Sequence, residues 1–243
     1  MKWRWDNIKL TLGAIGVLGL FAFANTRNSE RQLIVDDSIT FENDTELYIN
    51  HQSVNKLLIQ KNKHVRNLKK DALDLKELEN ILDENPMIKK AQVYLTVNGE
   101  LGVSIKQRKP IARVLANGSF YIDDEGEKMP LSENYSARVI LVTGNVTKKA
   151  YPIIKDLVTY ISADDFLKKH FVTVQIKSND ELYLVTRSQQ YKVHLGTISN
   201  IEKKFRNYKA FYVKATKDKI LDQYNLVNLE FNNQVVCTKK TTR

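Results

Sequence analysis

The chain has 243 residues, of which 42% are hydrophobic and 27% charged, a composition typical of folded proteins that excludes a largely disordered one. Its formal net charge of +10 favours anionic neighbours such as lipid headgroups, wall polymers, acidic protein faces or nucleic acid. The single cysteine, Cys237, excludes an internal disulfide, and the four histidines are too far apart in the sequence to indicate a zinc site.

An uncharged run, LTLGAIGVLGLFAFANT, occupies residues 10–26. As a helix it extends about 26 Å, close to the roughly 30 Å hydrocarbon core of a bilayer. Lys9 can snorkel and so lengthen the span. We therefore expect a transmembrane anchor at 10–26. Because the basic residues precede the run, residues 1–9 are expected in the cytoplasm and the rest of the chain outside.

A cleaved signal peptide is the alternative interpretation of this segment. The sequence AFA at residues 22–24 has the small-x-small form of a cleavage site. The anchor is favoured because Trp3 and Trp5 suit a membrane interface. Whether Ala24 is a cleavage site stays open on the sequence alone.

Residues 27–33 are polar and are expected to form a short stalk before a first domain at 34–109. In that domain a loosely alternating strand is expected at 35–41, followed by a turn. A helix is expected at 53–61, with Ser53 as its N-terminal cap.

A second helix is predicted within LDLKELENILDENP, residues 73–86, where leucine and isoleucine recur with a 3.6-residue period. Asp74 suits its N-terminal cap. Pro86 closes it, because the residue before a proline is pushed out of helical conformation. The apolar stripe is interpreted as core, since it covers fewer heptads than a partner zipper requires.

After Pro86 the period changes to 2, which predicts a hairpin over residues 88–107. A two-residue turn at Asn98-Gly99 would place apolar residues opposite polar ones, so a three-residue turn at 97–99 is expected. That turn pairs Leu95 with Leu101 and Val93 with Val103. The first domain is thus predicted as strand, helix, helix and hairpin, with both helices on one face of a small sheet.

A mainly antiparallel β domain with two or three helices is predicted at 110–237, followed by a basic tail at 238–243. One helix is expected at 148–166. Another is expected from Thr197, and it buries Ile201, Phe205, Tyr208 and Tyr212. The expected strands are 120–122, 137–144, 171–177, 181–187, 190–196, 224–231 and 234–237.

An acidic turn and the cysteine are both interpreted as structural. Asp123, Asp124 and Glu125 are expected to be solvated rather than to bind a cation, because EF-hand spacing is absent. Cys237 lies in an apolar strand and is expected to be a small packed side chain.

The basic residues of the last helix are expected to be solvated, with contact to anionic lipid or wall polymer as the alternative. They are Lys203, Lys204, Arg206 and Lys209. Nucleic acid is not expected outside the cytoplasm. The sequence has no nucleophile elbow, phosphate loop or metal pair, so we expect a non-enzymatic protein without cofactor, metal or small-molecule substrate.

The order of these pieces resembles the FtsQ/DivIB family of bacterial cell-division proteins, which have a short cytoplasmic tail, one membrane span, a POTRA domain and a β domain. Individually the motifs are weak, and it is their order that carries the resemblance. They are Asn85-Pro86, the strand pair 88–107, QRKPIA at 107–112, the turn at 123–126, Pro130-Leu131, Gly144 and the ending YNLVNLEFNNQVVCTKK, whose QVVC is similar to the Bacteroidetes branch.

The resemblance implies a single-pass scaffold of the inner membrane, concentrated at the division site, that helps control septum assembly. It also implies a complex with two small bitopic partners, FtsL and FtsB (DivIC), formed by strand addition at an exposed edge. We expect that edge at 231–237, the last apolar strand. A charge or proline at Val235 is then expected to abolish partner capture. The implied site residues are Phe231, Asn233, Val235 and Cys237, with Asn233 and Val235 on one strand face, and Arg206 and Tyr212 on the flanking helix.

Two other functions stay open on the sequence. One is a membrane-anchored POTRA adaptor for protein export or outer-membrane assembly, although the chain shows neither repeated units nor the length of a barrel. The other is a wall-active hydrolase with an unrecognised site.

Overall fold

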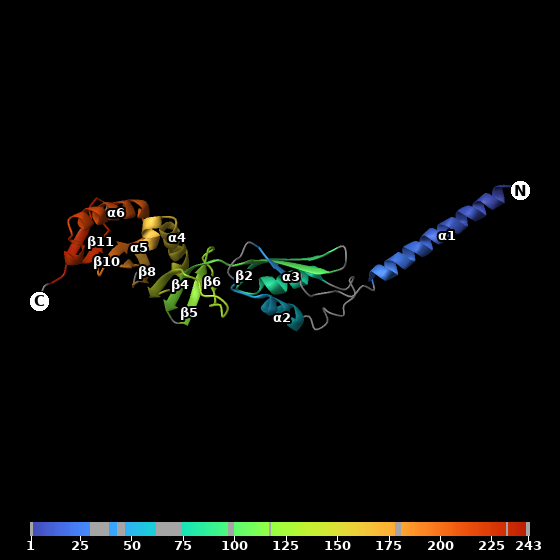
Figure 1. The fold of residues 1–243 in the computed structure, drawn as a ribbon, viewed down its shortest axis with the longest axis horizontal. Coiled ribbons are helices and arrows are strands. Elements are labelled where there is room, and N and C mark those ends of the chain that lie inside the picture. Colours follow the sequence, from blue (N-terminus) through green and yellow to red (C-terminus); the bar gives the residue numbers. More distant parts are fainter. Residues whose placement is uncertain are drawn as a thin grey trace. The chain divides into compact units, whose positions relative to one another are not determined.

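In the computed structural model the chain divides into two compact units, Met1–Gln107 and Arg108–Arg243, and each is described by itself (Figure 1). The described residues are 2–29, 39–42, 47–61, 74–96, 100–116, 118–177, 181–231 and 233–241. Part of the expected stalk, the start of the first strand and the hairpin turn at 97–99 lie outside them.

The N-terminal helix, α1 (Lys2–Ser29), contains the uncharged run and continues past its end. Its large apolar side chains between Leu10 and Phe23 are 62–75% exposed. Among the residues whose side chains are described, no helix is long and apolar enough to cross a membrane.

The first unit also contains a small sheet and two further helices, in the expected order of strand, helix, helix and hairpin. The sheet has the order β1-β3-β2, with β1 parallel to β3 and β2 antiparallel to it. Its core joins residues from all five elements. The elements are β1 (Ile39–Phe41), α2 (His51–Lys61), α3 (Leu75–Asp83), β2 (Ile88–Leu95) and β3 (Leu101–Gln107).

The two helix starts differ in how well the sequence predicted them. Helix α3 begins as expected, with the Asp74 carboxylate accepting hydrogen bonds from the backbone N–H groups of Lys76 and Glu77. Helix α2 begins at His51, two residues early. Asn50 Oδ1 accepts from the Ser53 N–H at 2.8 Å, so the expected cap at Ser53 is wrong. Asparagine is as good an N-terminal cap as serine. The residues that follow Asn50, HQS at 51–53, include no apolar side chain, so the apolar pattern did not mark them as helical.

The hairpin register confirms the expected pairing of apolar residues with apolar residues. Leu95 lies opposite Leu101 and Val93 opposite Val103. The Thr96 N–H donates to the Glu100 carbonyl at 2.9 Å, which leaves three residues for the turn. Apolar side chains of both strands therefore meet on the helix-covered face.

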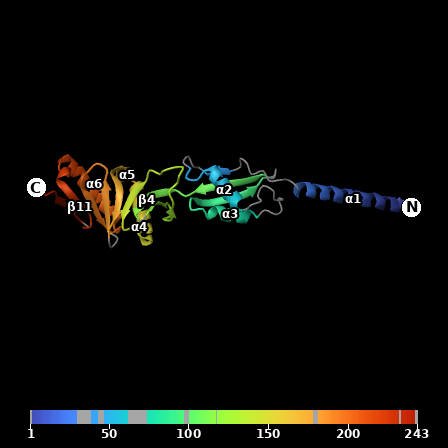
Figure 2. The same cartoon turned by 90° about the horizontal axis from the view of Figure 1, so that it is seen from below.

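The second unit is built on a nine-stranded sheet of order β12-β11-β10-β9-β8-β7-β4-β5-β6. Figure 2 shows these strands side by side, from red β11 to yellow-green β4. The sheet is mixed, because β4·β7, β7·β8 and β10·β11 are parallel pairs and the remaining pairs are antiparallel. The strands are β4 (Pro110–Ala116), β5 (Gly118–Asp123), β6 (Lys128–Met129), β7 (Ile140–Gly144), β8 (Phe171–Ile176), β9 (Leu182–Thr186), β10 (Lys192–Gly196), β11 (Tyr224–Asn228) and β12 (Val236–Lys239).

The helices of this unit include a break that the sequence did not predict. The helix expected at 148–166 is a short 3-10 turn η3 (Lys148–Ala150), α4 (Tyr151–Ser162) and α5 (Asp165–His170). The break occurs because the Asp164 carboxylate caps a new helix, accepting from Phe166 N and Leu167 N at 3.1 and 3.0 Å. After it come α6 (Ile201–Lys217), which begins four residues later than expected, and η5 (Leu221–Gln223).

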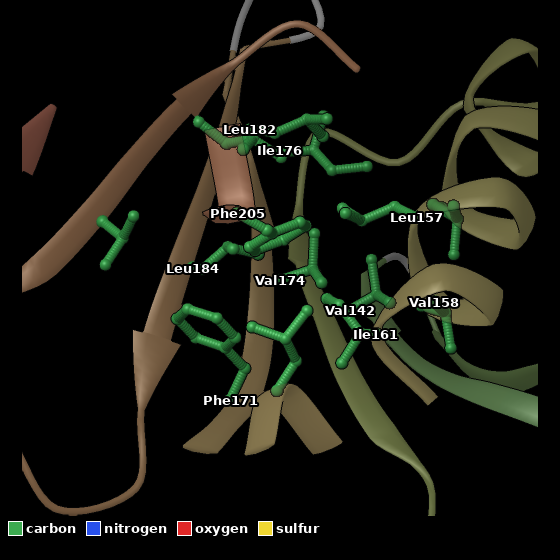
Figure 3. Close-up of a cluster of buried hydrophobic side chains, with 14 of the residues drawn as sticks. Val142, Leu157, Val158, Ile161, Phe171, Val174, Ile176, Leu182, Leu184 and Phe205 are labelled. Carbon is green, nitrogen blue, oxygen red and sulfur yellow. The ribbon is translucent and has the colours of Figure 1, made fainter. Parts of the chain in front are cut away.

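The helices cover one face of the sheet and share one core with it. Figure 3 shows Leu157, Val158 and Ile161 of α4 facing the strand residues Val142 and Val174. Phe205 of α6 lies in the same cluster. Of the four residues expected to be buried by this helix, Phe205 and Tyr208 are fully buried, whereas Ile201 and Tyr212 are only partly buried.

Candidate partner-binding edge

Strand β12 is the edge of the large sheet nearest the C-terminus. It pairs antiparallel with β11, placing Asn228 opposite Val236 and Val227 opposite Cys237. The expected strand at 231–237 is therefore shifted: residues 233–235 precede β12, which continues to Lys239. The polar segment EFNNQ explains the shift, because asparagine and glutamate are poor strand formers.

The backbone of β12 offers hydrogen-bonding groups on its free side. The Leu229 N–H donates to the His194 carbonyl of β10, so odd-numbered residues of this β11 segment face β10 and even-numbered ones face β12. Asn228 and Val236 are then a hydrogen-bonded pair, whereas Val227 and Cys237 are not. The N–H and carbonyl of Cys237 therefore point away from the sheet.

The side chains of this segment divide between the core and the outside. Val235 and Cys237 are partly buried against the core, while Val236 is 39% exposed. Burial raises the pKa of the Cys237 thiol, which keeps it protonated at neutral pH. This agrees with the expectation of a packed cysteine.

The connection between β11 and β12 carries the remaining expected residues. Phe231 is 47% exposed, as an aromatic contact residue would need to be. Asn233 is exposed, and its Oδ1 accepts a hydrogen bond from Lys203 Nζ of α6 at 3.0 Å. Since Asn233 and Val235 both precede β12, the expectation that they lie on one strand face is wrong.

The two expected helix residues have different surroundings. Arg206 is exposed. Tyr212 is partly buried and contacts the rings of Phe166 and His170, with centroids 5.2 and 4.8 Å apart. Six residues along a helix place the two on different faces. Tyr212 therefore serves the packing between α5 and α6, and only Arg206 is available at the surface.

A buried histidine beside this edge was not recognised in the sequence. His194 of β10 is 7% exposed and stacks on Tyr183 of β9, with centroids 4.3 Å apart. Its Nδ1 lies 3.4 Å from Glu230 Oε2, and its Nε2 lies 3.8 Å from Glu181 Oε2. Because Glu230 lies in the connection between β11 and β12, this contact ties the connection to the body of the sheet. A period-2 strand pattern gives no signal that one of its polar residues is buried.

The expectation of a solvated basic helix face is wrong for Lys204. Its side chain is 7% exposed, and Nζ donates to the carbonyls of Leu195 and Thr197 at 2.8 and 2.7 Å. Burial lowers its pKa. Lys209 likewise pairs with the Asp164 carboxylate that caps α5.

The acidic turn is also not solvated throughout. Asp123 is fully buried and paired with Arg108, while Asp124 is exposed. In the described part of the chain, no group of three or more histidine, cysteine, aspartate or glutamate side chains is placed to hold a metal ion.

Two family models match this chain. A model described as "POTRA-like domain" matches residues 34–106. A search of curated proteins found no match. A second model, described as "FtsQ/DivIB, C-terminal related", matches residues 109–238, which is more than half of the chain and includes β12 as far as Thr238. The chain therefore belongs to the FtsQ/DivIB family.

Proposed function

We propose that this protein is a non-enzymatic cell-division scaffold that holds its partners by strand addition at β12. Family membership supports the general role in cell division, since this is a family of non-enzymatic division scaffolds. The observation that carries the proposal is the free edge of β12, where Cys237 presents its N–H and carbonyl outward. An extended segment can bond to such an edge through its own backbone.

The proposed partners are the FtsL-like and FtsB/DivIC-like bitopic proteins. Backbone bonds to β12 supply affinity, and the neighbouring side chains supply selectivity. Phe231 and Val236 offer exposed apolar surface beside the edge, and Arg206 offers a charge on α6. In this proposal Tyr212 acts indirectly, through the packing of α6.

We expect Cys237→Pro to weaken binding of the FtsB/DivIC-like partner by about tenfold or more. Proline removes an N–H that faces away from the sheet, so the pairing with β11 stays intact while the edge loses a donor. Affinity is measured with the full chain in detergent and the purified partner. The matched control is Cys237→Ala, which removes the same thiol but keeps the N–H.

Equal loss of binding in both variants would show that the side chain matters rather than the edge backbone. Retained binding in Cys237→Pro, with its fold verified by circular dichroism, would contradict strand addition at β12. These two comparisons separate the role of the edge from the packing role of Cys237.

We also propose that residues 10–26 anchor the chain in the inner membrane, with residues 1–9 in the cytoplasm and the chain after residue 26 outside. The uncharged run and the basic residues before it support this. An alkaline phosphatase domain fused after Arg243 is expected to be active, and the chain should stay in the membrane after carbonate extraction. An inactive fusion would contradict the orientation, and release by carbonate would contradict the anchor.

The cellular role can be tested with a fluorescent protein fused before Met1. A band at midcell, with filamentous cells on depletion of the native copy, is the expected result. A uniform peripheral signal with normal division would instead favour the POTRA adaptor of protein export or outer-membrane assembly.

A further inference from the structure

The edge strand of the small sheet, β2, is covered on its free side by side chains of α3. In the order β1-β3-β2 this strand has a sheet neighbour on one side only. Because the Thr96 N–H faces β3, the N–H groups of odd-numbered β2 residues face outward. Two of these outward donors, Ala91 and Val93, are already bonded to carboxylates.

Both hydrogen bonds are made by carboxylates on one face of the helix. Asp83 Oδ1 accepts from the Ala91 N–H at 2.7 Å, and Glu79 Oε1 accepts from the Val93 N–H at 3.0 Å. The Val93 N–H, and after it Lys76, lower the pKa of Glu79, so this carboxylate is charged at neutral pH.

The spacing of the two elements explains why both bonds form together. Glu79 and Asp83 are one helical turn apart, about 6 Å along the axis. Ala91 and Val93 are two strand residues apart, about 6.8 Å. A short turn reverses the chain between α3 and β2, so Asp83 meets Ala91 and Glu79 meets Val93.

We propose that Glu79 and Asp83 form a carboxylate clamp that prevents β2 from accepting a strand. An added strand needs free N–H groups at alternate positions of the edge. The clamp occupies two of them and places negative charge where the carbonyl oxygens of an incoming strand would lie. By contrast, no described side chain accepts from the outward N–H of Cys237 on β12. This inference does not depend on which partner binds β12.

The clamp is tested by hydrogen exchange of the full chain in detergent, read by mass spectrometry in peptides that cover β2. In Glu79→Ala/Asp83→Ala, two β2 amides are expected to exchange about ten- to hundredfold faster, because each loses a hydrogen bond to a charged acceptor. The matched control is Glu77→Ala, an exposed carboxylate on the same helix, and its uptake should equal wild type.

The strand-blocking role has its own measurement, the oligomeric state. With the clamp removed, a second copy of the chain is expected to pair through β2, giving a concentration-dependent dimer by analytical ultracentrifugation. The proposal would be overturned if the double variant exchanged its β2 amides at the wild-type rate. It would also be overturned if these amides exchanged faster but the chain stayed monomeric. If amides of α2 and β3 also exchange faster in the double variant, the fold of this unit has been weakened. The single variants Glu79→Ala and Asp83→Ala then decide, because each should speed the exchange of one β2 amide.

Discussion

Replacing Asp123 with alanine is expected to lower the free energy of unfolding of the second unit by about 3–5 kcal/mol. The carboxylate is fully buried and accepts a hydrogen bond from Arg108 Nη1 at 2.7 Å. Its Oδ1 also accepts from the Glu125 and Glu127 N–H groups at 3.0 and 2.8 Å. Alanine leaves two amides without their acceptor, and the Arg108 guanidinium keeps only Glu125, whose Oε2 lies 3.6 Å from Nη1. Removing one partner of a buried pair costs more than the intact pair contributes.

The measurement is urea unfolding followed by near-ultraviolet circular dichroism of tyrosine. Both tryptophans lie in α1, so the tyrosine signal reports on the folded units. The control is Asp124→Ala, the exposed neighbour in the same turn, with an expected change within about 0.5 kcal/mol. If the two variants unfold at the same urea concentration, the buried ion pair does not have the proposed role.

Local patterns in the sequence were enough for those parts of the fold that are decided by near neighbours. The hairpin is the clearest case, because a period of 2 allows only one turn length that brings Leu95 and Leu101 together. The cap at Asp74 and the end of α3 before Pro86 also depend on a few adjacent residues. Each of these features can be argued without knowing the rest of the chain.

Features that depend on distant parts of the chain were not predictable in the same way. Nothing near β4 indicates that it pairs in parallel with β7, or that β7 continues the parallel arrangement to β8. The break at Asp164 was missed because an aspartate inside an amphipathic pattern can either face solvent or cap a new helix. Which of these happens is decided by packing and by the partner that Lys209 supplies.

The polar residues of the candidate site show the same limit. Lys204 and His194 look like ordinary surface residues in their own segments, yet both are buried and both lie near Glu230. The last strand begins at Val236, five residues after the start of the edge expected at 231–237, because the apolar residues after Glu230 were grouped with polar ones that do not form a strand. A burial pattern of this kind becomes visible only when β10, β11 and α6 are assembled.

The stability of the second unit is expected to fall as the pH drops from about 6.5 to about 4, and His170 is the group responsible for a large share of the loss. The ring is 8% exposed, and burial lowers its pKa to about 4. Its neighbours are neutral: Nε2 is 2.6 Å from Tyr208 Oη, and the rings of Phe166, Phe171 and Tyr212 surround it.

The direction follows from proton binding in the two states. In the unfolded chain His170 titrates near its ordinary pKa of 6.5, so between that pH and about 4 the unfolded state binds a proton that the folded state does not. The contribution is fully present above pH 6.5 and is lost as the pH falls. A pKa difference of about 2.5 corresponds to about 3 kcal/mol.

His170→Gln separates this effect from the carboxylates that also titrate in acid. Glutamine can keep the hydrogen bond to Tyr208 but cannot titrate, so wild type should lose about 3 kcal/mol more than the variant between pH 6.5 and pH 4. His51→Gln, which changes an exposed histidine of α2, should keep the wild-type slope. Parallel pH profiles for wild type and His170→Gln would show that the folded state takes up this proton. In that case His170 Nε2 would donate to Tyr208 Oη, and the hydroxyl of Tyr208 would donate onward to Tyr191 Oη, so the hydrogen-bonded chain could hold the charged ring without opening.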